Sequence, residues 1–164
     1  MTRRPLAVLA AAGAALALAG CAPTISVPPA PAATTTACAA LIVRLPSTLG
    51  ALPKRETDSQ GTAAWGDPEG VQLRCGVTPP GPTTDPCFTV SKVDWIRVDA
   101  GTGSAAREVW TTFGRTPATQ VVIDPKHATE NDALPPISDA VSAAMPTTDR
   151  KCTAPSLPSP SPTP

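Results

Sequence analysis

The sequence contains no tyrosine, a single histidine and only five aromatic side chains in 164 residues. Because histidine is the commonest metal ligand, its scarcity argues against a histidine-based metal centre. Charge is limited as well, since 13 Lys and Arg balance 13 Asp and Glu. That balance leaves neither the basic surface that nucleic acid requires nor a polybasic patch for anionic lipid. Beyond the N-terminal region, no apolar run is long enough to span a bilayer.

The N-terminal region has the parts of a bacterial lipoprotein signal. Arg3 and Arg4 precede an apolar run over residues 6–19, which is the layout of a secretory signal. Leu18-Ala19-Gly20-Cys21 matches a lipobox, in which small residues separate an aliphatic side chain from the cysteine. We therefore predict a signal peptide over residues 1–20. Acyl chains such as palmitate on Cys21 would then anchor the protein to the outer face of the cytoplasmic membrane.

Two alternatives to this interpretation concern the same residues. Cys21 could be incidental to an ordinary cleaved signal, because such signals also end in small residues. Arg3 and Arg4 also resemble a twin-arginine export signal, although paired arginines are common in any basic signal region. We favour general secretion and lipidation of Cys21.

The remaining cysteines are Cys38, Cys75, Cys87 and Cys152. An even number of cysteines in an exported protein predicts two disulfides. We favour Cys38–Cys152 with Cys75–Cys87, because the first pair brackets the expected domain and the second closes a Pro/Gly-rich loop. Zinc binding is disfavoured, since no two cysteines have C-x-x-C spacing.

Composition divides the mature chain into three parts. Residues 21–37 are rich in Pro, Ala and Thr and carry no charge, which predicts an unfolded tether of about 50 Å. Residues 38–152 form the single expected domain, and the Pro/Ser-rich tail 153–164 is also expected to stay unfolded.

Hydrophobic periodicity predicts a helix, several strands and a second helix. The first helix covers Thr36–Leu45 and stops before Pro46, and the second is opened by Pro135-Pro136 and ends before Pro146. The intervening extended segments are Lys54–Asp58, Ala63–Trp65, Val71–Val77, Phe88–Val98 with a break near Ser91, Glu108–Phe113 and Thr119–Ile123. This order predicts an α+β fold, an antiparallel sheet with an N-terminal and a C-terminal helix packed on one face.

Four short stretches carry a resemblance to a known family: Trp65-Gly66-Asp67-Pro68, Leu73-Arg74-Cys75-Gly76-Val77, Val93-Asp94-Trp95 and Thr111-Thr112-Phe113-Gly114-Arg115. The chain resembles, over about residues 38–145, the actinobacterial exported proteins of the domain of unknown function 3515. The resemblance implies an exported actinobacterial protein without assigned catalytic residues.

The same stretches supply candidate ligand-binding residues. Trp65 could stack on a sugar or peptide, with Asp67, Arg74 and Arg115 as polar partners. The alternative is that Trp65 packs in the core and that both arginines lie over the sheet. Trp95 is open to the same two interpretations.

Two acidic pairs suggest a hydrolase as the alternative. Glu56 with Asp58, or Asp67 with Glu69, would lie about 7 Å apart on one face of a strand, a separation suited to an inverting glycosidase. His127 lies in a polar loop without a partner nucleophile motif, which disfavours its role as a base. We therefore expect a non-enzymatic binding or scaffolding module without metal or cofactor, with an envelope protein or cell-wall ligand as partner. A purely structural spacer is a third possibility.

Overall fold

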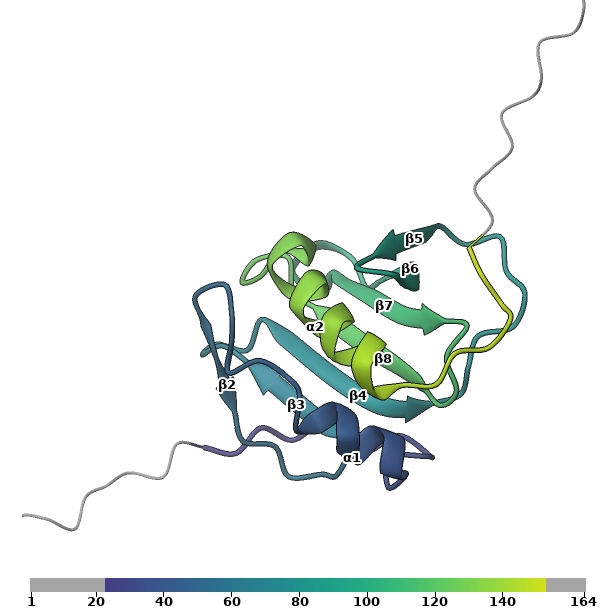
Figure 1. The fold of residues 1–164 in the computed structure, drawn as a ribbon. Coiled ribbons are helices and arrows are strands. Elements are labelled where there is room, and N and C mark those ends of the chain that lie inside the picture. Colours follow the sequence, from purple (N-terminus) through teal and green to yellow (C-terminus); the bar gives the residue numbers. More distant parts are fainter. Residues whose placement is uncertain (1–22, 153–164) are drawn as a thin grey trace, which may run out of the picture.

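The computed structural model describes residues 23–152, which form one eight-stranded antiparallel sheet and two α-helices (Figure 1). The strand order is β1-β2-β3-β4-β8-β7-β6-β5. Two meanders, β1–β4 and β5–β8, therefore join where β4 pairs with β8. Within the described residues, no helix is long and apolar enough to cross a membrane. The elements are α1 Thr36–Ile42, β1 Thr48–Leu49, β2 Leu52–Arg55, β3 Thr62–Trp65, β4 Val71–Val77, β5 Cys87–Val90, β6 Val93–Ala100, β7 Arg107–Phe113, β8 Ala118–Ile123 and α2 Glu130–Ala144.

The predicted antiparallel sheet, its two helices and its two disulfides are confirmed. Strand β4 has the bounds that the sequence predicts, and its alternation buries Val71, Leu73 and Cys75. The break near Ser91 is a two-residue turn between β5 and β6, in which Ser91 and Lys92 both have positive φ. That conformation suits the twist of a tight hairpin.

Helix α2 lies in front of the sheet in Figure 1, and the two helices contact each other. Helix α1 also contacts β4, while α2 contacts β1, β5 and β6. Side chains of both helices and of the sheet form one buried apolar cluster. It includes Leu41 of α1, Ile137 of α2, Trp65 of β3 in the first meander and Trp110 of β7 in the second. The core therefore depends on residues from both meanders.

Helix α1 is shorter than predicted. It begins at Thr36 after Thr35, whose hydroxyl accepts from the Cys38 amide, and it ends at Ile42. Leu45 lies beyond the helix but is still buried, so its place in the apolar pattern reflects burial and not helical structure.

The expectation that Pro135-Pro136 opens the second helix is wrong, because both prolines lie inside α2. The helix starts after Thr129, whose hydroxyl accepts from the Asp132 amide. The two prolines remove the hydrogen bonds to the carbonyls of Asn131 and Asp132. Both of those residues are exposed, so water can satisfy their carbonyl groups, and burial of α2's apolar face holds the helix together.

The favoured disulfide pairing is also wrong. Cys38 is bonded to Cys75 and Cys87 to Cys152, with Cα–Cα distances of 5.5 and 5.8 Å. Cys75 is on the buried face of β4, where α1 covers it, whereas Cys87 begins the edge strand that the C-terminal segment reaches. Each pair is thus decided by which segment the fold places against the strand that carries the other cysteine.

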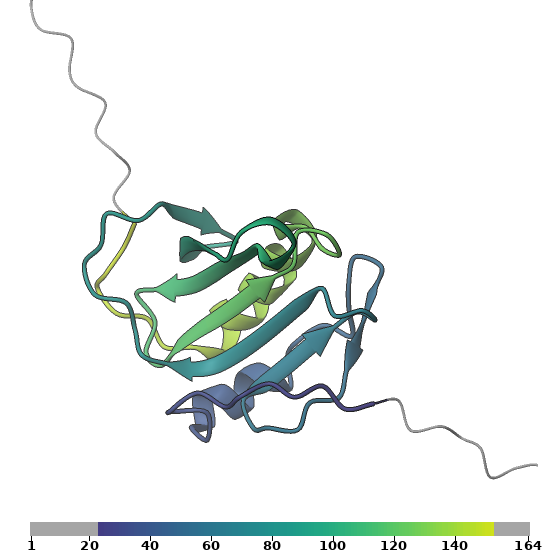
Figure 2. The same cartoon turned by 180° about the vertical axis from the view of Figure 1, so that it is seen from behind.

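The segment before α1 does not behave as the expected unfolded tether. Ile25 forms a bridge with Thr57, and Val27, Ala30 and Ala33 are buried. Figure 2 shows this segment running across the back of the domain before it turns into α1. We call residues 23–35 the N-terminal strap.

Candidate functional site

Trp65 belongs to the core and offers no surface to a ligand. Its side chain is fully buried, and its indole Nε1 donates to the carbonyl oxygen of Pro46 at 3.1 Å. Trp95 is equally buried and donates to the hydroxyl of Ser138 in α2 at 2.9 Å. Both polar ends are therefore satisfied inside the protein, as buried tryptophans require.

Arg115 is buried as well, where it closes the end of α2. Its guanidinium donates to the carbonyl oxygen of Met145, the residue that caps the helix, at 2.6 Å. A cation at the C-terminal end of a helix interacts favourably with the helix dipole, and here it also donates to a carbonyl group that has no partner within the helix. Burial lowers the pKa of Arg115, and the nearby charge of Asp94 opposes that effect.

Arg74 and Asp67 lie in different surroundings from Trp65. Arg74 points to the opposite side of β4 from the buried Leu73 and donates to Gln120 of β8. Asp67 is exposed and forms an ion pair with Arg55 at 3.3 Å. The four residues predicted as one ligand site are therefore not assembled around one cavity, and Trp65 and Arg115 have packing roles.

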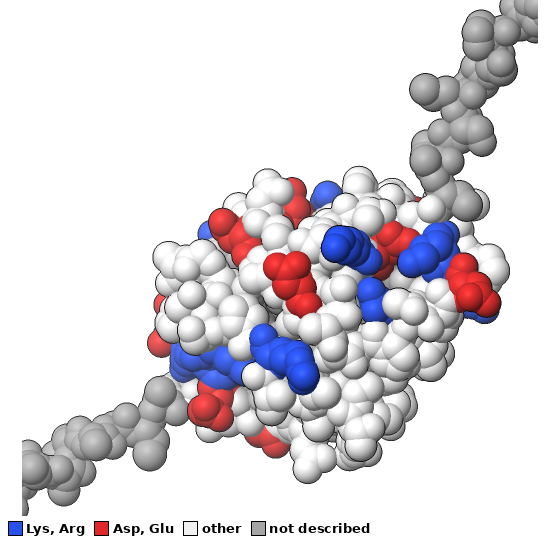
Figure 3. Space-filling model, viewed as in Figure 1, with Lys and Arg blue, Asp and Glu red and all other residues white. Residues whose placement is uncertain are grey.

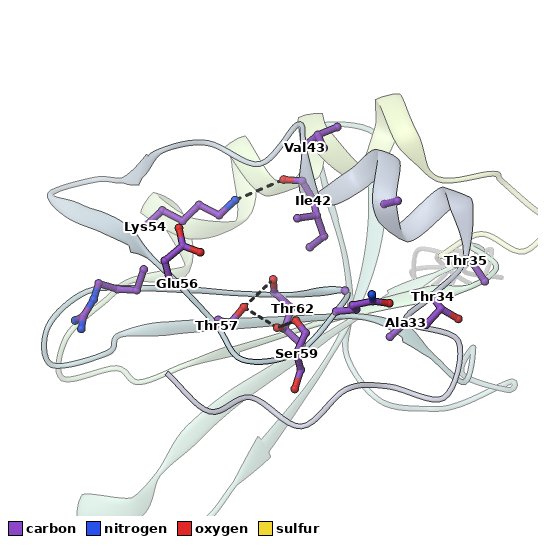
Figure 4. A pocket seen from close by; sticks show the side chains of 14 residues that line it. Ala33, Thr34, Thr35, Ile42, Val43, Lys54, Glu56, Thr57, Ser59 and Thr62 are labelled. Atoms are coloured by element: carbon purple, nitrogen blue, oxygen red, sulfur yellow. Dashed lines mark hydrogen bonds between the residues drawn. The ribbon is translucent and has the colours of Figure 1, made fainter. Parts of the chain in front are cut away.

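A groove of about 540 Å³ lies between α1, β2 and the N-terminal strap (Figure 4). Its volume is typical of a small-molecule site. It is lined by Ala33, Thr34, Thr35, Ala39, Ile42, Val43, Lys54, Arg55, Glu56, Thr57, Ser59, Gln60, Gly61 and Thr62.

The groove combines an apolar wall with polar groups of both charges. Ile42 and Val43 come from the end of α1, and Val43 is 78% exposed. Facing them are Lys54 of β2 and Glu56, which follows the strand after Arg55, with Lys54 Nζ 3.5 Å from the carbonyl oxygen of Ile42. Hydroxyl groups of the β2–β3 loop complete the lining, so the groove can accept both apolar and polar ligand groups.

Part of this hydroxyl lining is fixed by internal hydrogen bonds. The Thr62 hydroxyl donates to the carbonyl oxygen of Ser59 at 2.6 Å and lies 2.8 Å from the Thr57 hydroxyl, which in turn is 3.3 Å from the Thr62 carbonyl oxygen. These contacts hold the loop in one arrangement. A preorganised wall loses little entropy when a ligand binds.

The predicted acidic pairs are split by the fold. Glu56 lines the groove, whereas the neighbouring Asp58 accepts from the backbone amide of Val27 at 3.2 Å and from the hydroxyl of Ser59 at 3.1 Å. Hydrogen bonds from Ser26, Val27 and Ser59 lower the pKa of Asp58. Asp67 pairs with Arg55, and Glu69 accepts from Gln72 at 2.7 Å.

A second hollow, of about 550 Å³, lies beside the Cys87–Cys152 disulfide. The loop over residues 82–86 forms one side of it, and every residue of that loop is exposed. Phe113 and Ile96 supply its apolar floor. Its loop wall lacks the strand and helix support of the α1–β2 groove, so we assign the candidate site to that groove.

The described residues hold no group of three or more His, Cys, Asp or Glu side chains that could bind a metal ion. His127 is exposed in the turn that precedes α2. The predicted lipidation site Cys21 lies outside the described residues.

The comparisons with known proteins place the chain in a family. A family model described as "Protein of unknown function (DUF3515)" matches residues 5–150. The chain belongs to this family. The resemblance carried by Trp65–Val77 is thereby confirmed, and the DUF3515 match extends beyond residues 38–145 at both ends. No curated protein and no solved structure matches the chain.

Within this DUF3515 domain, the family-like stretches and the groove occupy different places. Trp65, Trp95 and Arg115 make internal contacts, while most of the groove comes from the strap and from residues 54–62. The sequence carries only a weak signal for the groove, because Thr, Ser and Gln in a loop are ordinary surface residues. Glu56 is the one groove residue that the sequence analysis singled out.

Proposed function

We propose that this protein is a lipid-anchored binding module of the bacterial cell envelope, and that its ligand occupies the groove between α1 and β2. The groove carries the proposal, because it joins an apolar wall to hydroxyl groups, to the cationic side chains of Lys54 and Arg55 and to the carboxylate of Glu56. Membership of the DUF3515 family is compatible with this function but assigns none. The actinobacterial and extracytoplasmic location implied by the family resemblance and the lipobox is part of the same proposal.

The lining favours a short peptide as ligand. Lys54 can bind a carboxylate and Glu56 an amine, while Ile42 and Val43 can cover an aliphatic side chain. Hydroxyl groups of Thr57 and its neighbours can bond to peptide amides and carbonyls. Cell-wall peptides have this chemistry and are available outside the cytoplasmic membrane.

A hydrolase that uses paired carboxylates is less well supported. Hydrolysis of a glycosidic bond requires two carboxyl groups on opposite sides of that bond. Glu56 is the single acidic residue of the groove lining, and Asp58 is engaged by the strap. We also infer that both helices pack on one face of the sheet, an arrangement in which α1 forms one wall of the groove.

A binding screen tests the proposal. Oxidised protein is mixed with short cell-wall peptides and, separately, with cell-wall saccharides, and its melting temperature is measured. A peptide at about one hundred times its dissociation constant stabilises by about 2.7 kcal/mol, which should raise the melting temperature by roughly 10 °C. Lys54→Gln and Glu56→Gln should each reduce the shift, whereas Lys92→Gln, far from the groove, should not.

Mass spectrometry of the same mixtures tests the alternative. Intact peptide and saccharide after incubation support a binding module. Cleavage that is lost in Glu56→Gln would establish the hydrolase instead. The absence of a shift with every peptide would contradict the proposed ligand class.

A further inference from the structure

The N-terminal strap is attached to the domain from its first described residues. The backbone amide of Ile25 donates to the Glu56 carbonyl at 2.9 Å, and the amide of Asp58 donates to the Ile25 carbonyl at 3.2 Å. Arg55 donates to the carbonyl oxygen of Pro23 at 3.1 Å. The folded domain therefore includes Pro23, about fifteen residues earlier than composition predicts.

Close packing holds the rest of the strap in place. Val27 has no exposed surface, and the amide of Ala32 donates to the Gly76 carbonyl at 3.0 Å. Gly76 has a φ of +99°, and a Cβ at this position would lie 2.4 Å from the backbone nitrogen of Ala33. Only glycine permits this approach, so β4 is shaped to receive the strap.

The strap leaves almost no free chain between the domain and the predicted anchor. One residue, Ala22, separates Cys21 from Pro23. Consecutive Cα atoms are about 3.8 Å apart, so the Cα atoms of Cys21 and Pro23 lie within about 7.6 Å of each other. A tether of about 50 Å is excluded by this packing.

We propose that the end of the domain around Pro23 and Arg55 rests directly on the lipid headgroups of the membrane. This inference rests on the proposed lipidation of Cys21. The surface includes the strap bridge at Ile25 and Thr57 and the exposed Asp67. The partner is the bilayer surface itself, and the domain is held against it with one orientation.

The orientation follows from the positions of the two ends of the described chain. The first and last segments of the described chain leave the domain at opposite ends in both views (Figures 1 and 2). The Cys87–Cys152 disulfide and the loop over residues 82–86 therefore face away from the membrane. The groove instead adjoins it, because Arg55, Glu56 and Thr57 both line the groove and contact the strap.

Charge does not hold this surface to the membrane. Arg55 already pairs with Asp67, and basic and acidic side chains adjoin each other at this end of the molecule (Figure 3). Without a basic excess, attraction to anionic headgroups is weak. The acyl chains must supply the attachment, so high salt should neither release nor reorient the domain.

The test measures the distance of two positions from the bilayer. Lipidated full-length protein is reconstituted in vesicles of phosphatidylcholine and phosphatidylglycerol that contain a headgroup-linked energy acceptor. A fluorescent non-natural residue replaces either Gln60, at the groove, or Thr84, in the loop at the far end, which leaves the disulfide cysteines unchanged. We expect several-fold stronger energy transfer from position 60 than from position 84.

A Gly/Ser insertion between Ala22 and Pro23 provides the matched control. About sixteen inserted residues add about 22 Å of mean reach, so transfer from position 60 should fall toward that from position 84. Equal transfer from both positions without the insertion, or no effect of the insertion, would overturn the proposal. So would unacylated Cys21 in the intact-mass spectrum or unchanged vesicle binding of Cys21→Ser. Because no groove ligand is present, failure of the proposed binding function leaves this result unaffected.

Discussion

The two disulfides connect the ends of the chain to the sheet in contrasting surroundings. Cys38–Cys75 joins α1 to a central strand, and both cysteines are fully buried in the core. Cys87–Cys152 joins the edge strand β5 to the C-terminal segment, and both of its cysteines are half-buried. The first bond helps to hold a structural layer of the domain, whereas the second fastens one segment to its edge.

Chain separation alone predicts that the edge disulfide stabilises the fold more than the buried disulfide. The cysteines are 37 residues apart in the buried pair and 65 in the edge pair. Loop-closure entropy then predicts stabilisation of about 3.8 kcal/mol for the buried bond and about 4.3 kcal/mol for the edge bond. The surroundings of each bond should reverse this order, because local opening at an edge leaves the rest of the core intact.

The largest effect is expected from removal of the buried bond. Cys38→Ala combined with Cys75→Ala should lower the free energy of unfolding by about 4–5 kcal/mol, since lost chain constraint adds to lost core packing. Urea denaturation measures this change. A loss smaller than that of the edge variant would contradict the comparison.

The edge bond should have a smaller effect. Cys87→Ala combined with Cys152→Ala should cost about 2–3 kcal/mol, because the C-terminal segment keeps other contacts, such as the Thr148 amide with the Gly114 carbonyl at 2.8 Å. Urea denaturation of this variant, run beside that of the buried-bond variant, gives the comparison directly.

The greater exposure of the edge disulfide predicts that it is reduced more easily than the buried disulfide. Under mild reductant without denaturant, thiol alkylation and mass spectrometry should find Cys87 and Cys152 modified before Cys38 and Cys75. Simultaneous modification of both pairs would show that reduction requires global unfolding.

Arg115 tests how firmly the C-terminal segment is attached beyond its disulfide. Arg115→Met should lower stability by about 1.5 kcal/mol, because the Met145 carbonyl loses a charged hydrogen-bond donor. Arg115→Lys keeps the charge and should recover part of that loss. Thermal melts of the three proteins measure the effect, and a more stable Arg115→Met variant would show that burial of the guanidinium outweighs its hydrogen bond.

The smallest effect concerns the N-terminal strap at Asp58. Hydrogen bonds lower its pKa in the folded protein, so its ionised form stabilises the fold above the unfolded pKa near 3.8. That stabilisation is lost as the pH falls through the still lower folded pKa. The melting temperature of Asp58→Asn should therefore lie slightly below that of the original protein at pH 6, and the difference should shrink as the pH falls below 3.8. A difference that grows toward low pH would contradict this assignment.

Local sequence patterns predicted much of the sheet. Alternation over Val71–Val77 fixes which side of β4 is buried, and Ser91 marks the β5–β6 turn. The apolar spacing of Ile137 and Val141 indicates a helix, but it does not show that the helix continues back through Pro135 to Thr129. Helix ends depend on capping and burial, which a short periodic pattern does not contain.

The candidate site was less predictable. Trp65 was a candidate ligand-binding residue with core packing as the alternative, and its indole bonds to Pro46 inside the core. Thr34 and Gln60 carried no sequence signal, because they come together only when the strap lies against the β2–β3 loop. A groove built from separate segments has no single motif.

By itself, the sequence determined family membership, through its match over residues 5–150. Local patterns also determined the α+β plan and the inward direction of Cys75, because periodicity involves residues close together in the chain. The tertiary structure decided that Cys75 meets Cys38, that residues 23–35 belong to the domain and that α1 and β2 enclose a groove. The physical reason is that side-chain direction follows from local backbone geometry, whereas the partner it meets depends on which distant segment covers that face of the sheet.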